Sequence, residues 1–208
     1  MTAALRQDAA PAAAPAEAPL VSVEGLTVRF RGGDGEIAAV NGVDFTLERG
    51  KVLTILGESG SGKSVTLKAM MRLHPPRRTR YGGGIRIGGR DILSLSEREL
   101  GQVRGSVVSM IFQEPMLAFD PVYTIGRQIA ETVVRHEGVS YRDAEKRALE
   151  LLELVQIPSA ARRLKAYPHE MSGGMRQRAM IALALSCRPD LLLADEPTTA
   201  LDATVQMQ

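Results

Sequence analysis

The segment KVLTILGESGSGKS, residues 51–64, is the most informative part of this sequence for the fold. Its first seven residues are a short, mostly apolar run that ends in Gly57, and the residues from Lys63 onward, KSVTLKAMMRL, favour a helix. A short apolar run that leads through glycine into a helix is typical of a buried parallel strand. The stretch therefore predicts a strand over residues 51–57, a glycine-rich loop, and a helix that begins near Gly62.

The loop GESGSGKS, residues 57–64, matches the pattern glycine, any four residues, glycine, lysine, and then serine or threonine. Glycine lets the backbone N–H groups from Glu58 to Lys63 converge on phosphate oxygens, because a side chain would block that approach. The N-terminus of the following helix adds a partial positive charge. We expect Lys63 to reach the β- and γ-phosphates of a bound nucleotide and the hydroxyl of Ser64 to bind Mg²⁺.

Two acidic residues end the apolar run LLLADEP, residues 191–197. Alone this is a weak signal, since many strands end in solvated acids. Beside the phosphate loop it indicates that Asp195 holds Mg²⁺ and that Glu196 acts as general base for the attacking water. Gln113 ends the strand-like run VVSMIFQ, and we expect its amide to contact the metal or the water.

The rest of the chain predicts an α/β fold with two additions. Before the phosphate loop, LVSVEGLTVRF alternates apolar and polar residues as a strand does, a turn follows at RGGDGE, and a second strand pair is expected around IAAVNGVDFTLERG. A glycine-rich hairpin is expected at YGGGIRIGGRDI. Residues 124–166 have helical patterns, and another helix is expected to start at Ser172.

Composition limits the functional classes. The 208 residues, 44% of them hydrophobic, suffice for one main domain. The net charge is only +2, and the 26 basic residues are spread along the chain instead of clustering, which argues against nucleic acid as a partner. A single cysteine excludes a disulfide framework, and no run approaches the roughly 18 consecutive apolar residues of a membrane-spanning helix. Residues 1–19, rich in alanine and proline, are interpreted as a disordered leader.

Four motifs in this order, GESGSGKS, IFQEP, MSGGMRQR and LLLADEPTTALD, resemble the ATP-binding subunits of ABC transporters. The resemblance covers residues 20–208. More narrowly, IFQEPMLAFDPVYTIGRQIAE and YPHEMSGGMRQRAMIALAL are similar to the ATPases of oligopeptide, dipeptide and nickel importers. The resemblance to ABC transporters implies a P-loop NTPase (RecA-like) core with an antiparallel β subdomain and an inserted α-helical subdomain at about 114–180. The helical subdomain would touch a membrane partner.

The resemblance also implies a set of site residues. Ser172 and Gly174 would close over the γ-phosphate held by a second ATP-binding subunit, and Asp202 would lie near that opposite site. Phe30 is the best candidate for the aromatic ring that stacks on adenine, although packing into the core is a comparable alternative. The expected nucleotide contacts are Gly57, Glu58, Ser59, Gly60, Ser61, Gly62, Lys63, Ser64, Thr66, Phe30, Ser172, Gly173, Gly174 and Asp202.

The family also has a switch histidine some tens of residues beyond the Asp202 loop, on a strand between the phosphate-loop strand and the Asp195 strand. The three histidines of this chain, His74, His136 and His169, all come too early. We therefore expect a chain truncated at its C-terminus, without the last strands of the core. On its own such a chain would have doubtful stability and ATPase activity.

The implied function is ATP hydrolysis coupled to import of peptides or a related small solute. Implied partners are a second ATP-binding subunit, integral membrane permease subunits and, indirectly, an extracytoplasmic solute-binding protein; the implied location is the cytoplasmic face of the inner membrane. Three alternatives stay open: a soluble ABC-type ATPase that acts on nucleic acid or ribosomes, a P-loop kinase or GTPase, and a nucleotide-binding fragment without turnover. The Ser-Gly-Gly segment disfavours a kinase, and the lack of an Asn-Lys-x-Asp motif disfavours a GTPase.

Overall fold

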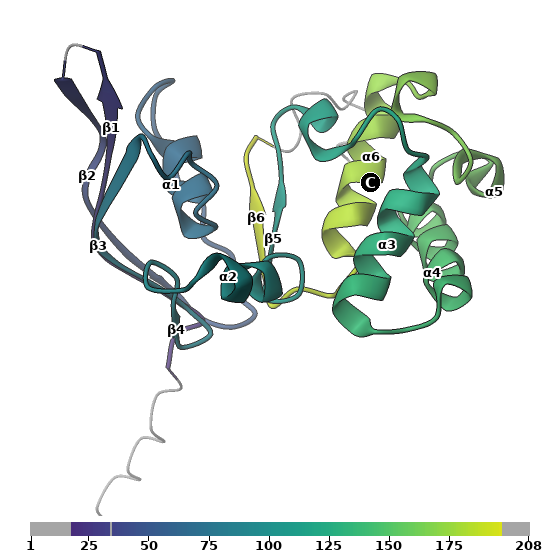
Figure 1. Cartoon of the computed structure of the whole chain (residues 1–208), viewed down its shortest axis with the longest axis horizontal. Helices are drawn as coiled ribbons and strands as arrows, with labels where there is room; N and C mark the ends of the chain where they lie inside the picture. The colour runs from purple at the N-terminus through teal and green to yellow at the C-terminus, as the bar shows by residue number, and fades with distance from the viewer. Residues whose placement is uncertain (1–17, 34, 197–208) are drawn as a thin grey trace, which may run out of the picture.

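The computed structural model of the chain describes residues 18–33 and 35–196. The predicted leader, except for its last two residues, and Asp202 lie outside the described residues. Figure 1 shows three layers. An antiparallel sheet with α1 forms one side, β5 and β6 stand side by side in the middle, and a group of helices forms the other side.

The antiparallel sheet has the strand order β2-β1-β3-β4. Its apolar face packs on α1 because alternate residues of β1, such as Val21, Val23 and Val28, are buried in one cluster with Ala69 and Met70. The region around IAAVNGVDFTLERG, expected as a strand pair, is one strand, because β1 supplies a single neighbour along its length. The strands are β1 (Val21–Gly32), β2 (Gly35–Leu47), β3 (Thr79–Ile87) and β4 (Arg90–Asp91).

Two short helices belong to this side of the molecule. Helix α1 (Lys63–Met70) follows the glycine-rich loop, as predicted. Helix α2 (Glu97–Val103) begins with a capping box, in which the Ser96 hydroxyl accepts from the Glu99 N–H and the Glu99 carboxylate accepts from the Ser96 N–H.

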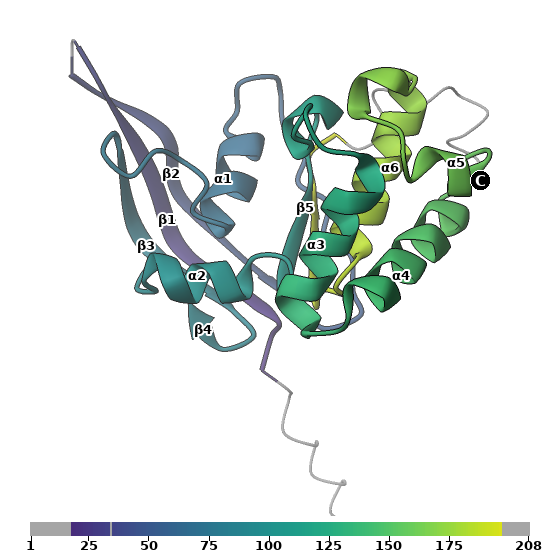
Figure 2. The ribbon, with the colours of Figure 1, turned by 45° about the vertical axis from the view of Figure 1, so that its right-hand side comes forward.

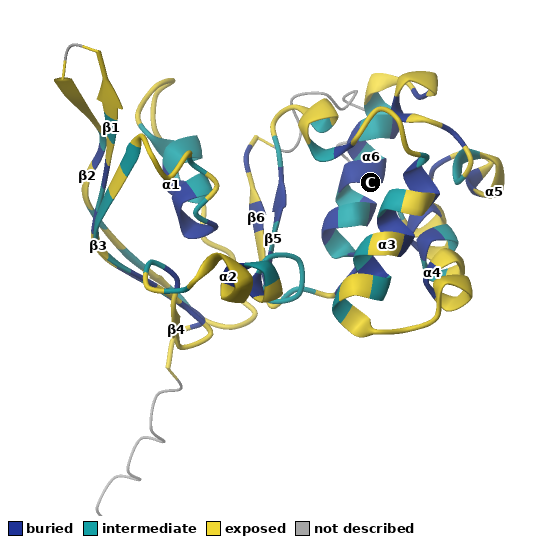
Figure 3. Cartoon of the chain, viewed as in Figure 1, coloured by how far each residue is buried: buried dark blue, intermediate teal, exposed yellow. Residues whose placement is uncertain are grey.

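The middle layer consists of two parallel strands, β5 (Val108–Ile111) and β6 (Leu191–Ala194), paired from Val108↔Leu191 to Ile111↔Ala194. The apolar run that forms β6 is typical of a buried strand, but burial alternates along it. Leu191 and Leu193 are buried, whereas Leu192 is 41% exposed. One face of β6 therefore lacks a covering layer among the described residues, as the alternating colours in Figure 3 show.

The helical layer has its own apolar cluster, which runs from Ile111 to Ala184. Figure 2 shows α3, α4 and α6 lying against one another, with α6 next to β5. Three of these helices begin at a hydroxyl cap, Thr124, Ser140 or Ser172. The helices are η1 (Pro115–Ala118), α3 (Ile125–Glu137), α4 (Tyr141–Leu154), α5 (Ala160–Arg163), η2 (Pro168–Glu170) and α6 (Gly173–Leu185).

The predicted strand over residues 51–57 does not form, and this prediction was wrong. Val52 is 93% exposed and Leu56 is 87% exposed, and the segment has no strand pairing. An apolar cleft of about 710 Å³ separates residues 50–55 from β6. A strand exists only as part of a ladder, and no described segment lies in this cleft to pair with residues 51–57. The cleft lies where the resemblance places the strand of the switch histidine.

Candidate nucleotide-binding site

The glycine-rich loop before α1 depends on glycine for reasons within the chain itself. Gly60 (φ +81°) and Gly62 (φ +93°) have left-handed backbone conformations, which side chains of L-residues disfavour. A Cβ at Gly57 would lie 2.5 Å from the Ser61 Oγ, and a Cβ at Gly62 would lie 2.6 Å from the Ala39 carbonyl oxygen. The loop is therefore tightly folded against β2, with Gly62 as the N-cap of α1.

Lys63 is the first residue of α1, and its side chain reaches back to the start of the loop. Its ammonium donates to the Gly57 carbonyl at 2.7 Å and to the Glu58 carbonyl at 2.8 Å. These bonds hold a positive charge beside the N-terminus of α1, where the free N–H groups of the first turn also favour an anion. Thr66 is buried in α1 at 5% exposure, so its nucleotide contact stays a prediction.

Ser64 and Asp195 meet directly. The Ser64 hydroxyl donates to the Asp195 Oδ1 at 2.7 Å, and Asp195 is only 4% exposed. The strand ladder positions this carboxylate, because the Asp195 N–H donates to the Ile111 carbonyl at 3.0 Å, one residue beyond β6. A hydroxyl and a carboxylate are hard oxygen donors, and a site with few protein ligands suits Mg²⁺, which retains water and binds phosphate oxygens.

Gln113 and Glu196 also meet, although the sequence predicted only their separate roles. The Gln113 Nε2 donates to the Glu196 Oε2 at 2.9 Å. Each residue lies two positions beyond the end of its strand, β5 or β6. The carboxyl ends of parallel strands lie at the same edge of a sheet, which brings the two side chains together.

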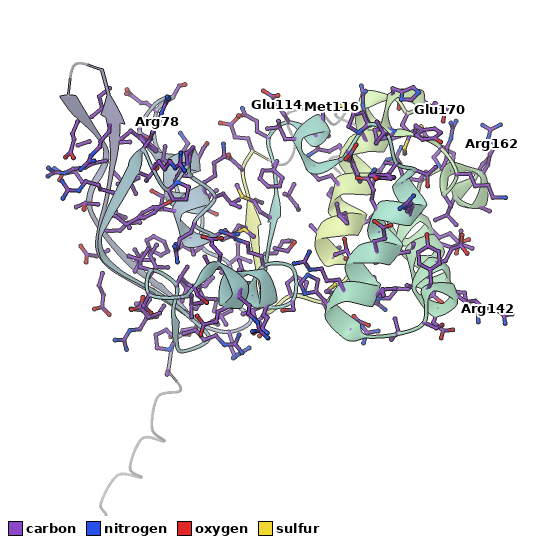
Figure 4. All side chains as sticks on the ribbon, in the orientation of Figure 1. Arg78, Glu114, Met116, Arg142, Arg162 and Glu170 are labelled. Carbon is purple, nitrogen blue, oxygen red and sulfur yellow. The ribbon has the colours of Figure 1, made fainter. Side chains whose placement is uncertain are left out.

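The structure thus gathers Lys63, Ser64, Gln113, Asp195 and Glu196 at the junction of α1 with the ends of β5 and β6. The segment that follows Gln113 then passes α6, where the Arg176 guanidinium contacts the Met116 sulfur at 3.4 Å. Figure 4 labels Glu114 and Met116 at the upper middle of the view, where η1 lies beside α6. Contacts between η1 and α6 therefore join the site to the helical layer.

Phe30 is half-buried on β1 and packs against the core of the sheet side. Its ring also meets the ring of His74 edge to face, with centroids 5.1 Å apart. His74 was not predicted to be near any site residue, and no local pattern around it gives such a signal. Core packing is thus observed for Phe30, and adenine stacking stays a prediction.

Ser172 caps α6, and its hydroxyl accepts from the Met175 N–H at 3.3 Å. Gly173 and Gly174 do not have positive φ angles, and a Cβ at either position would meet none of the described residues within 4 Å. Helix α6 lies on the opposite side of β5 and β6 from α1 (Figure 1). The single chain therefore does not bring these residues to its own phosphate loop.

Between residues 18 and 196, residue 34 excepted, no three His, Cys, Asp or Glu side chains cluster as a metal centre. In the same part of the chain, no helix combines the length and the apolar character that crossing a membrane requires.

Residues 40–199 match the family model described as ABC transporter. A peptide import ATP-binding protein of Brucella abortus (strain 2308) is 53% identical over 191 residues, which are 92% of this chain and 58% of that protein. The oligopeptide transport ATP-binding protein OppD of Bacillus subtilis (strain 168) is 50% identical over 190 residues, 91% of this chain and 53% of that protein. The chain thus spans little more than half the length of these relatives.

Among solved structures, the dimeric ATP-binding cassette MJ0796 bound to ADP and Pi has a TM-score of 0.80. It is 30% identical, and the match covers 90% of this chain and 78% of that chain. This agrees with the predicted P-loop NTPase core. The family match, which includes the phosphate loop, Gln113, the Ser172 segment and both acidic residues, shows that the chain belongs to the ABC transporter family.

Proposed function

We propose that this chain is the ATP-hydrolysing part of an ABC importer for peptides or a related small solute. One observation carries the proposal: two hydrogen bonds, Ser64 to Asp195 and Gln113 to Glu196, converge beside the N-terminus of α1. They place metal-binding oxygens, a carboxylate base and a lysine ammonium around one phosphate-binding loop. This is the set of groups that phosphoryl transfer to water requires.

The residues divide the work by position. The backbone N–H groups of residues 58–63 and the Lys63 ammonium bind the phosphates. Ser64 and Asp195 would hold Mg²⁺, which would neutralise charge on the phosphate oxygens. Glu196 accepts a proton from the attacking water, and the Gln113 amide orients the Glu196 carboxylate by donating to its Oε2 at 2.9 Å.

A second ATP-binding subunit completes the site. Among the described residues, neither backbone conformation nor packing explains glycine at positions 173 and 174, and this favours a contact with a partner subunit. The open N-terminus of α6 offers free N–H groups and a partial positive charge. We infer that Ser172, Gly173 and Gly174 contact the γ-phosphate held by the partner subunit, and that Asp202 lies at the same interface. The dimeric state of MJ0796 supports this arrangement.

The names of the relatives support transport of peptides, and this favours a transporter over the alternative of a soluble ATPase acting on nucleic acid. Integral permease subunits would bind the helical layer, which we place at about residues 114–180. The chain would then lie at the cytoplasmic face of the inner membrane. An extracytoplasmic binding protein would deliver solute to the permease subunits. ATP binding would close the two subunits and hydrolysis would release them.

Glu196→Gln tests the mechanism. The variant keeps the hydrogen-bonding shape of the side chain and loses the base, so turnover should fall by about 10²–10⁴-fold while ATP affinity is kept. Phosphate release, calorimetric titration with ATP and light scattering would measure turnover, affinity and a trapped dimer. Glu114→Gln, a change at an exposed neighbour of Gln113, is the matched control. Undiminished turnover in Glu196→Gln would contradict the proposal, and ATP binding without turnover in the parent chain would favour a non-hydrolysing fragment.

A further inference from the structure

We infer that His74 is a positioning residue, which holds the ring of Phe30 beside the phosphate helix as a stacking surface for the adenine base. The inference rests on the proposed function, because it concerns the same nucleotide site. It goes further by assigning a role to a side chain that belongs to none of the recognised motifs.

His74 is fixed from two directions. Its Nε2 lies 3.0 Å from the Val65 carbonyl oxygen, so this nitrogen carries the proton and donates it to α1. Its ring meets the Phe30 ring at an interplanar angle of 77°, with centroids 5.1 Å apart, which is a favourable edge-to-face geometry. Val65 directly follows Ser64, so a single imidazole connects the first turn of the phosphate helix to Phe30.

The segment after His74 is also tied to β1. The Arg31 N–H donates to the Arg78 carbonyl at 2.8 Å, and Phe30 pairs with Thr79 in the sheet. The Thr79 hydroxyl in turn donates to the Pro75 carbonyl at 2.8 Å. The backbone that follows His74 is therefore fixed against β1, which keeps the imidazole near the Phe30 ring.

Phe30 is close to the phosphate loop along β2. Its partner across the strands is Ile37, and two residues further on the Ala39 carbonyl lies against Gly62. Phe30 is only half-buried, so the residue stays partly accessible while its ring contacts His74. A ring that is supported, partly open and next to a phosphate site is suited to stack on a nucleotide base.

The test compares two probes, ATP and inorganic tripolyphosphate, each with Mg²⁺, by calorimetric titration of the full 208-residue chain. Phe30→Ala should weaken ATP binding by about 5–150-fold, the range for loss of one base-stacking contact, and leave tripolyphosphate binding unchanged. His74→Ala should weaken ATP binding by about 2–10-fold, the value of one aromatic pair, again without effect on tripolyphosphate. His169→Ala, at an exposed histidine away from this contact, should change neither affinity.

The double variant Phe30→Ala with His74→Ala separates positioning from support of the fold. If His74 acts through Phe30, the double variant binds ATP no more weakly than Phe30→Ala alone. Additive losses, or equal losses for ATP and tripolyphosphate, would overturn the inference. If the parent chain binds neither probe, the proposed function fails as well. If the parent chain binds both probes and His74→Ala binds ATP as tightly as the parent does, the proposed function stands and only the inference about His74 is rejected.

Discussion

Two helices of this molecule begin at a glycine-containing segment, and they use glycine differently. Before α1, Gly60 and Gly62 have positive φ angles, and a Cβ at Gly62 would collide with the Ala39 carbonyl. At the start of α6, Gly173 and Gly174 have ordinary backbone conformations and open space in front of them. Backbone strain and a close neighbour account for glycine in the first segment, whereas no described residue accounts for it in the second, which agrees with the proposed contact with a partner subunit.

The effects of a substitution on folding and on assembly can be separated at these two segments. A residue whose identity is fixed by its own backbone and neighbours affects folding when it is changed. A change at a residue with open surroundings leaves folding intact and affects only contacts with a molecule that binds there. The two segments should therefore respond in opposite ways to the same change, glycine to alanine.

The largest loss of stability is expected for Gly62→Ala. The left-handed conformation costs about 1–3 kcal/mol for a non-glycine residue, and the contact with the Ala39 oxygen adds strain. Urea unfolding should show a free energy of unfolding lower by about 3 kcal/mol or more, with ATP affinity lost as well. Gly60→Ala is the matched control: its φ is also positive, but nothing lies within 4 Å, so it should lose about 1–2 kcal/mol only. Equal losses in the two variants would show that the clash has no influence.

The reverse pattern is expected for Gly174→Ala. The free energy of unfolding should stay constant or rise by less than about 1 kcal/mol, since alanine is the better helix former. Turnover should fall by about 100-fold, the cost of losing one well-placed donor to the reacting group, because a methyl group would block approach of the partner's phosphate. Unfolding and phosphate-release assays measure the two effects. Gly101→Ala in α2, where the nearest atom to a Cβ is 3.6 Å away, should change neither strongly. Full turnover in Gly174→Ala would contradict the partner contact.

How much the sequence predicts follows the same division. The helix after the glycine-rich loop, the helix start at Ser172 and a hairpin at residues 81–92 are local patterns; all three elements form, the hairpin over residues 79–91. The prediction of a strand over 51–57 was wrong, because the apolar residues show a tendency to form a strand but do not reveal whether another strand lies beside them. Likewise, the contact of His74 with Phe30 joins residues 44 positions apart, and no spacing rule connects them.

Ser172 and Ser140 allow a finer comparison, because both hydroxyls cap a helix. Ser172 accepts from the Met175 N–H at 3.3 Å and Ser140 from the Asp143 N–H at 3.2 Å. Ser172→Ala and Ser140→Ala should each lower the free energy of unfolding by about 1 kcal/mol, the usual value of a cap. Only Ser172→Ala should also lower turnover at saturating ATP. If both variants lost turnover in the same proportion, the effect of Ser172 would be one of stability alone.

The smallest effect is expected where the two sides of the molecule touch. His136, near the end of α3, packs on Gly105. A Cβ added at Gly105 would lie 2.8 Å from the His136 Nε2. Burial, and then the charge of Arg135, lower the pKa of His136 below its ordinary value. The folded state therefore binds fewer protons at this site than the unfolded state does, so its contribution to stability is present above the unfolded pKa of about 6.5 and is lost as the pH falls.

His136→Gln should remove this part of the pH dependence. The parent chain should lose more of its free energy of unfolding between pH 7.5 and pH 5.5 than His136→Gln does, whereas His169→Gln, at an exposed histidine, should behave as the parent. Urea unfolding at the two pH values measures the difference. The parent chain is expected to lose more stability because protonation of His136 would place a second positive charge beside Arg135, and Gly105 packs closely against the same ring. Equal pH dependence in the parent and in His136→Gln would mean that the contact between the two sides opens before the proton arrives.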